Sequence, residues 1–280
     1  MPVRTDLALE SVDLSRLPEG VHVNERGKVT RITEIIIDDD SCLHSIGRGK
    51  GRYITLETGD MSRYTDDTEA IATEFAEELR RLIPEGEVLV AGLGNSDITP
   101  NALGPQAVSR VLATRHLRDD EEFGDSIGSL RSVAAFFGGV LGQTGIETAE
   151  LIRAVADRIK PSAVIAVDSL ACSDISRLGT TVQITDSGIS PGSGVANARK
   201  ELSEKVMGVP VIAVGVPTVV DMHTIVRSLT GEEAGTEMPN MMVTPRDIDR
   251  LTERAAQLLA YGINLALQPS MSFEDVRDIF

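Results

Sequence analysis

The sequence contains no tryptophan, few aromatic residues and only two cysteines. Aromatic residues make up 3% of the 280 residues, so the core has to be built from Val, Ile, Leu and Ala. Cys42 and Cys172 lie far apart in the chain, which favours free thiols in a reducing cytoplasm over a disulfide framework. For Cys172, a small buried side chain is the favoured interpretation, and a reactive thiol is the alternative.

Basic residues are also scarce. Lys and Arg total 27 against 43 Asp and Glu, which gives a net charge of −16. A chain this acidic is repelled by nucleic acid and by anionic membranes, and no run of Lys and Arg offsets that charge, so neither is an expected partner. The sequence shows no secretory signal and no apolar stretch long enough to cross a bilayer, which predicts a cytoplasmic protein.

The pattern of apolar residues is typical of an α/β fold. After Glu87, short apolar runs alternate with helical segments, as in a largely parallel sheet buried on both faces. The predicted strands are 31–37, 52–57, 87–92, 132–137, 163–168, 181–185 and 209–215, and the predicted helices are 66–83, 105–118, 145–159, 197–206, 217–229 and 246–266. We expect a three-layer α/β/α sandwich with a largely parallel, mixed central sheet. Residues 66–268 would form this core, and residues 7–65 a small N-terminal β extension.

Most glycines and sharp turns follow the strands, at the sheet edge where open α/β folds bind their ligands. The acids on that edge are Asp97, Asp168, Asp186 and Asp221. A peptide-hydrolysing carboxylate pair needs two acids close enough to share a proton. Asp168 directly ends a buried strand, which favours a functional role, whereas Asp186 and Asp221 are better interpreted as turn and cap residues.

Two glycine-rich segments could contact an anion. Gly92-Leu93-Gly94 lacks the third glycine of a dinucleotide fingerprint, because Asp97 occupies that place, so a tight turn is the better interpretation. Pro191-Gly192-Ser193-Gly194 precedes a predicted helix. Its amides at Gly192, Ser193 and Gly194 are candidates for oxyanion or substrate contact, with a structural turn as the favoured alternative.

No pattern indicates a metal, a cofactor or a serine nucleophile. The four histidines do not show metal-ligand spacing, and neither H-E-x-x-H nor C-x-x-C occurs. The G-x-S-x-G elbow of the serine hydrolases is absent as well. The sequence therefore predicts neither a metal nor a cofactor.

Taken together, the sequence resembles the germination protease of endospore-forming bacteria. The matching segments are VRTDLALE (3–10), GRYITLE (51–57), GLGNSDITPNALGP (92–105), VLATRHL (111–117), GGVLGQTGIET (138–148), the run from 166 to 203, GVPVIAVGVPTVVD (208–221) and MVTPRDID (242–249). The resemblance implies a homotetrameric endopeptidase of the forespore or spore core that cuts small acid-soluble spore proteins. It also implies the fold of hydrogenase maturation endopeptidases, although the lack of a suitably placed His weakens a metal-sensing role.

The resemblance further implies an atypical acid protease with two catalytic aspartates. One corresponds to Asp168, and the other falls on Asn101 in the segment TPNALGP. An amide cannot take a proton from water, so we expect severely weakened activity. Three explanations remain open. The chain is an inactive variant, natural or engineered; or Asp97 substitutes; or the family's first acid mainly orients substrate. A spore-protein-binding protein without activity is the alternative function.

The N-terminus matches the family's processing site, according to the same resemblance. Thr5-Asp6-Leu7-Ala8 fits that pattern, so we predict that an inactive precursor is cut between Asp6 and Leu7. Residues 1–6 would then be a propeptide, and residues 7–280 a single peptidase domain. The propeptide would act like a bound product, close to the active site.

Overall fold

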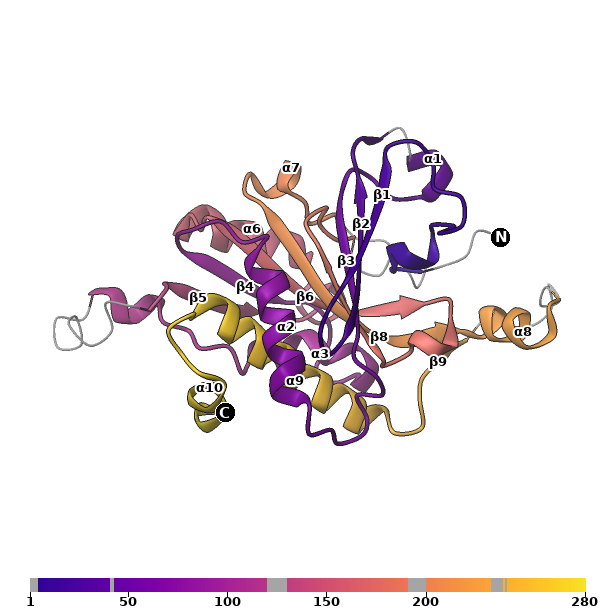
Figure 1. Cartoon of the computed structure of the whole chain (residues 1–280). Helices are drawn as coiled ribbons and strands as arrows, with labels where there is room; N and C mark the ends of the chain where they lie inside the picture. Colours follow the sequence, from indigo (N-terminus) through magenta and orange to yellow (C-terminus); the bar gives the residue numbers. More distant parts are fainter. Residues whose placement is uncertain (1–4, 41–42, 120–129, 191–199, 233–238, 240) are drawn as a thin grey trace.

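The protein forms a mixed sheet with helices on both faces, as predicted (Figure 1). The computed structural model describes residues 5–40, 43–119, 130–190, 200–232, 239 and 241–280. Within these residues the sheet has nine strands in the order β1-β2-β3-β7-β8-β6-β4-β5, and β9 pairs with β8. The strands β8, β6, β4 and β5 run parallel, and every other pairing is antiparallel.

The strand positions follow the predicted runs, with one strand more at each end of the sequence. The strands are β1 (Val21–Arg26), β2 (Arg31–Ile37), β3 (Gly51–Glu57), β4 (Val88–Gly92), β5 (Val133–Phe137), β6 (Ala163–Cys172), β7 (Thr181–Thr185), β8 (Val211–Asp221) and β9 (Met242–Val243). Because β3 is hydrogen-bonded to β7, the N-terminal strands continue the same sheet.

The helices lie on both faces of the sheet. They are α1 (Leu43–Ile46), α2 (Thr68–Arg80), α3 (Leu103–Val108), α5 (Leu141–Thr144), α6 (Thr148–Ile159), α7 (Glu204–Met207), α8 (Met222–Thr230), α9 (Ile248–Leu267) and α10 (Phe273–Ile279), with 3₁₀ turns η1 (Ala8–Glu10), η3 (Thr99–Asn101), η4 (Arg115–Asp119) and η5 (Ile175–Arg177). One core cluster joins the sheet to α2, α3 and α9, and another joins it to α6. In the described part of the chain, no helix has the length and apolar character needed to cross a membrane.

The continuous apolar strands are buried on both faces of the sheet, which explains why polar and apolar residues do not alternate along them. Val88 and Val90 of β4 face the α2, α3 and α9 side, whereas Leu89 faces α6. The helices α2 and α9 approach closely where the buried ring of Phe75 lies on Gly262. A Cβ atom at that glycine would be 2.0 Å from the Phe75 ring.

Two central strands are longer than predicted, which corrects one helix. The structure extends β6 to Cys172 and β8 to Asp221, so residues 217–221 are strand and not the start of a helix. Val219 and Val220 pair with the last two residues of β6, and this cross-strand pairing prevails over a helical start. The helix that follows begins at Met222 with Asp221 as its N-cap, in agreement with the predicted cap role.

The predicted helix at 105–118 is interrupted because one side chain of α9, that of Asn264, binds its backbone. Asn264 is 1% exposed. It accepts a hydrogen bond from Leu112 N at 2.8 Å and donates one to Arg110 O at 2.9 Å. These bonds hold the chain between α3 and η4 in a non-helical course. Sequence periodicity alone does not reveal them.

We expect Asn264→Leu to lower the free energy of unfolding by about 1–3 kcal/mol, because it leaves an N–H and a C=O without partners. Urea denaturation measures this loss. Gln257→Leu is the matched control, since Gln257 lies on the same helix, is half-buried and bonds only the Tyr261 hydroxyl in the described contacts. Its expected change is within about 0.5 kcal/mol. Equal losses in the two variants would contradict this role of Asn264.

Acid should destabilise the contact between α2 and the β1–β2 turn. Glu74 accepts hydrogen bonds from the backbone N–H of Val29 at 2.9 Å and of Thr30 at 2.8 Å, and from the Thr30 hydroxyl at 2.7 Å. Burial raises the pKa of the Glu74 carboxyl, but these bonds and one from Lys28 N outweigh burial and hold the pKa below its ordinary value. The folded pKa is therefore lower than the unfolded one. The stabilisation is complete above the unfolded value and is lost as the pH falls through the folded value.

We expect Glu74→Gln to lower the melting temperature at pH 7 and to flatten its decline between pH 5 and about pH 3. Thermal melts across this range measure both effects. The exposed Glu77 lies one turn further along the helix, and Glu77→Gln is the control that should keep the acid dependence of the parent protein. An unchanged acid decline in Glu74→Gln would count against the assignment.

Candidate active site

Asp168 is the sixth of the ten residues of the central strand β6 and is 5% exposed. The prediction that it ends the strand is wrong, because pairing with β8 continues to Cys172. Its Oδ1 accepts a hydrogen bond from Ser169 N at 2.8 Å. Side chains alternate along a strand, so Asp168 is directed to the same side of the sheet as Val164, the side covered by α6. Its partner on β8 is Gly215, where a Cβ atom would be 2.6 Å from the Asp168 carbonyl oxygen. The absence of a side chain there allows β6 and β8 to approach.

The loop after β4 is packed tightly against the end of β6. Leu93 N donates to Val167 O at 2.8 Å, at the residue directly before Asp168. Gly104 closes this contact, because a Cβ atom there would be 2.3 Å from the carbonyl oxygens of both Leu93 and Val167. Gly94 has a φ of +118°, which favours glycine. The tight turn predicted at 92–94 is therefore present.

The structure gives Asn101 and Asp97 different surroundings within this loop. Asn101 is half-buried, and its backbone closes the turn: its N–H donates to Ile98 O at 2.7 Å, and its carbonyl accepts from Asn95 N at 3.0 Å. Asp97 is exposed, and its Oδ2 accepts from Gln143 Nε2 of α5 at 3.1 Å. Gln143 also donates to Asn95 Oδ1 at 2.7 Å. The Asp97 carboxylate is thus engaged with α5 on the exposed side of the loop.

The predicted cleavage point lies against the strand that carries Asp168. Asp6 N donates to Ala171 O at 2.9 Å, and Asp6 Oδ2 accepts from Ala171 N at 2.8 Å. Leu7 is 0% exposed and packs against Cys172. Proteases bind an extended, accessible chain, so the Asp6–Leu7 bond can be cut only after this segment leaves its position.

The thiol of Cys172 is buried in the structure. Cys172 is 0% exposed, and burial, with smaller contributions from Glu10 and Asp174, raises the pKa of its thiol to about 12. The interpretation as a small buried side chain is confirmed. In the described ranges, no three His, Cys, Asp or Glu side chains are grouped closely enough to hold a metal ion. The segment with Gly192, Ser193 and Gly194 lies outside the described residues.

A pocket of about 610 Å³ adjoins the strand pair that carries Asp168. Gly215, Leu170 and Asp6 line it, together with further basic and acidic side chains, which are Arg48, Lys50, Lys205, Asp40 and Glu201. Arg48 Nη2 donates to Thr5 O at 2.6 Å, so this cation already contacts the N-terminal segment. Sequence reasoning missed this pocket, because its basic side chains come from parts of the chain that only the fold brings together.

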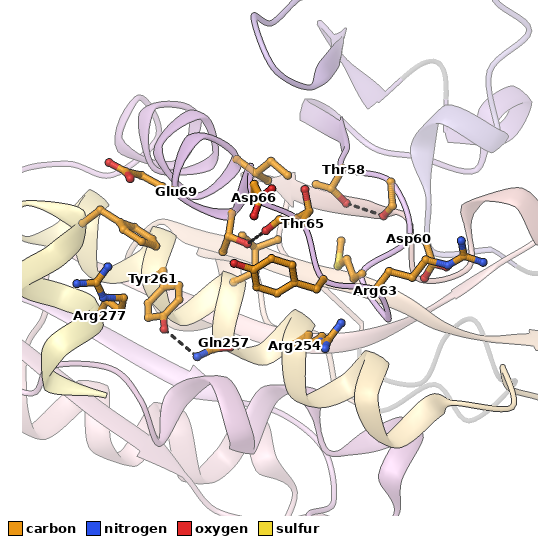
Figure 2. A pocket seen from close by; sticks show the side chains of 17 residues that line it. Thr58, Asp60, Arg63, Thr65, Asp66, Glu69, Arg254, Gln257, Tyr261 and Arg277 are labelled. Atoms are coloured by element: carbon orange, nitrogen blue, oxygen red, sulfur yellow. Dashed lines mark hydrogen bonds and ion pairs between the residues drawn. The ribbon is translucent and has the colours of Figure 1, made fainter.

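A second pocket, of about 600 Å³, lies on the opposite side of the sheet between α2, α9 and the linker after β3 (Figure 2). Its charged and polar groups contact one another. Gln257 Nε2 donates to the Tyr261 hydroxyl at 2.7 Å, Arg63 pairs with Asp60 at 2.9 Å, and Arg254 donates to Ser62 O. Its apolar lining includes members of the α2–α9 core cluster, which separates it from the side that Asp168 faces.

A family model described as germination protease matches residues 7–231, which include the loop with Asn101 and the strand with Asp168. The chain belongs to the germination protease family. A germination protease of Caldanaerobacter subterraneus is 41% identical, and the alignment covers 99% of this chain and 98% of the relative. That of Clostridium tetani is 37% identical over 99% of this chain and 98% of its own length.

Two further similarities cover a smaller share of this chain. The germination protease of Priestia megaterium is 43% identical over 80% of this chain and 65% of its own length. Among solved structures, a NiFe hydrogenase maturation protease HycI from Thermococcus kodakarensis matches with a TM-score of 0.39 and 17% identity, over 66% of this chain and 98% of that one. Membership of the germination protease family makes this chain a hydrolase of the protease class that serves spore germination.

Proposed function

We propose that this chain is an endopeptidase that begins the degradation of small acid-soluble spore proteins during germination. Asp168 would polarise the substrate carbonyl or activate a bound water, with residue 101 opposite it. One observation supports this proposal above the others. The loop that carries residue 101 is hydrogen-bonded to Val167, the neighbour of Asp168, so this loop and the middle of β6 are in contact.

The proposal includes maturation from an inactive precursor. Residues 1–6 would be a propeptide, cut between Asp6 and Leu7, and residues 7–280 a single peptidase domain with its extension at 7–65 and core at 66–268. Support comes from the pairing of Asp6 with Ala171, three residues beyond Asp168 on the same strand. A segment held there would restrict access to the active site in the manner of a bound product.

Further parts of the proposal concern substrate contact, assembly and place of action. The amides of Gly192, Ser193 and Gly194 would contact the oxyanion or the substrate backbone, without metal or cofactor. The enzyme would act as a homotetramer in the cytoplasm of the forespore and spore core.

Asn101 favours a second candidate function. With an amide in place of a carboxylate, the chain would recognise spore proteins without cutting them, as a pseudo-protease. Asp97 offers an intermediate case, in which this exposed acid supplies the missing proton transfer. Its bond to Gln143 would then have to be given up first.

Purified small acid-soluble spore proteins test the two candidates. The endopeptidase proposal predicts slow cleavage by the unaltered chain, and no cleavage by Asp168→Asn. Cleavage that persists in Asp168→Asn would contradict it. Tight binding by the unaltered chain with no cleavage would support the second function, and binding is measured by calorimetry in the same samples.

A further inference from the structure

An irregularity in β8 lies directly beside the candidate active site. Leu170 of β6 pairs with Pro217, and Ala171 pairs with Val219, so Thr218 is an extra residue without a partner in the register. Such a β-bulge redirects a side chain and is frequent next to active sites. Proline has no N–H to contribute to the ladder, which explains why Pro217 is tolerated in a central strand at this point.

The bulge directs a fully buried hydroxyl to the loop that carries residue 101. Thr218 is 0% exposed, and its Oγ1 donates to Pro100 O at 2.7 Å. Thr252 of α9 is also 0% exposed, and its Oγ1 donates to Thr99 O at 3.3 Å. These two carbonyls belong to the residues immediately before Asn101. Two buried hydroxyls from distant elements thus hold one short turn.

We propose that Thr218 and Thr252 are positioning residues for residue 101. They act through the turn at 99–101 and do not touch substrate. This inference rests on the proposed function, since it assigns them a part in the same reaction. The strand β8 also pairs Gly215 with Asp168, so one strand sets the position of both reacting side chains.

The turn is formed by its own backbone hydrogen bonds, whereas the two threonines only fix where it lies. Asn101 N donates to Ile98 O and Asn95 N donates to Asn101 O, and these bonds do not involve either threonine. Loss of a threonine hydroxyl therefore leaves the turn formed but lets it shift against β6. A displacement of about 1 Å near the reacting groups costs up to about a hundredfold in rate, whereas substrate binding along the rest of the cleft is retained.

The test uses Asn101→Asp as the parent enzyme, with spore-protein cleavage as the assay. Thr218→Val should lower kcat by about tenfold or more with KM within about twofold, and Thr218→Ser should restore kcat. The matched control is Thr114→Val, because Thr114 is 3% exposed and its hydroxyl also donates to a backbone carbonyl, that of Arg131. This control should lower the melting temperature and leave kcat within about twofold. If Thr218→Val does not fold, Thr252→Val is compared with Thr114→Val in its place.

A second measurement, by NMR, does not depend on catalytic activity. In the unaltered chain, the NMR resonances of the Asn101 side-chain amide should shift in Thr218→Val and stay in place in Thr114→Val. If Asn101→Asp cuts no spore protein, the proposed function fails, and these resonances alone decide whether the threonine sets the position of residue 101. Unchanged resonances together with an unchanged kcat would overturn the inference.

Discussion

Asn101→Asp should raise the rate of spore-protein cleavage by about 10²–10⁴-fold, the range that a general acid or base contributes. The substitution replaces an amide, which cannot take up a proton, by a carboxylate of nearly the same shape. The turn that holds residue 101 uses its backbone groups, so the new side chain should occupy the same position. Initial rates at several pH values measure the gain, which should follow the titration of two coupled acids.

Two variants make this result specific. Asn24→Asp adds the same charge at an exposed position of β1 and should give no gain. Asp168→Asn introduced into Asn101→Asp should abolish the gain, because the pair then lacks its other member. No increase in rate on restoring the aspartate would count against a two-acid mechanism. A loss of the unaltered chain's slow activity in Asp97→Asn would instead identify Asp97 as the substitute acid.

Glu10→Gln should speed cleavage of the N-terminal segment by about tenfold to a hundredfold. The Glu10 carboxylate accepts from Ser173 N and Ser173 Oγ at 2.7 Å and from Asp174 N at 3.0 Å, and it also receives the Thr5 hydroxyl. An amide has only one accepting oxygen, and hydrogen bonds to a charged group contribute about 1.5–3 kcal/mol each. Each 1.4 kcal/mol lost would raise the released population about tenfold, and cleavage follows that population when opening is fast.

An added protease specific for acidic residues measures release without relying on the chain's own activity. The fragment cut at Asp6–Leu7 is followed by mass spectrometry. Asp13→Asn is the matched control, since Asp13 accepts from Ser15 N and Ser15 Oγ in an exposed local turn and should leave the rate unchanged. Equal acceleration in both variants would show that Glu10 does not hold the segment in place.

Whether each central element is a strand or a helix could be predicted, because the pattern of apolar residues that indicates it lies within the element itself. The residues of β4 and the first five residues of β6, 163–167, are apolar at every position, and burial on both faces requires that composition whatever the neighbouring strands are. The amphipathic spacing of Ile71, Phe75 and Leu79 likewise predicts α2, and all three side chains are buried. The ends of elements were less predictable. The helix expected from 217 begins at Met222, because β8 continues through its pairing with β6.

The residues of the candidate site likewise fall into those that the sequence could predict and those that it could not. Asp168 and Asn101 could be proposed as candidate residues from short segments, because an apolar run followed by an acid, and a short motif, are both written in consecutive residues. The bulge at Thr218 and the donor from Thr252 could not, because a register shift depends on the partner strand. The pairing of Asp6 with Ala171 joins residues 165 positions apart.

The sequence alone determined the family, the α/β class and the aliphatic core. These properties depend on the identity and order of neighbouring residues. The tertiary structure decided which basic side chains share a pocket with Asp6, what holds the turn at residue 101, and that Leu7 is inaccessible. These depend on contacts between distant segments, whose geometry is set by the packing of the whole sheet and its helices.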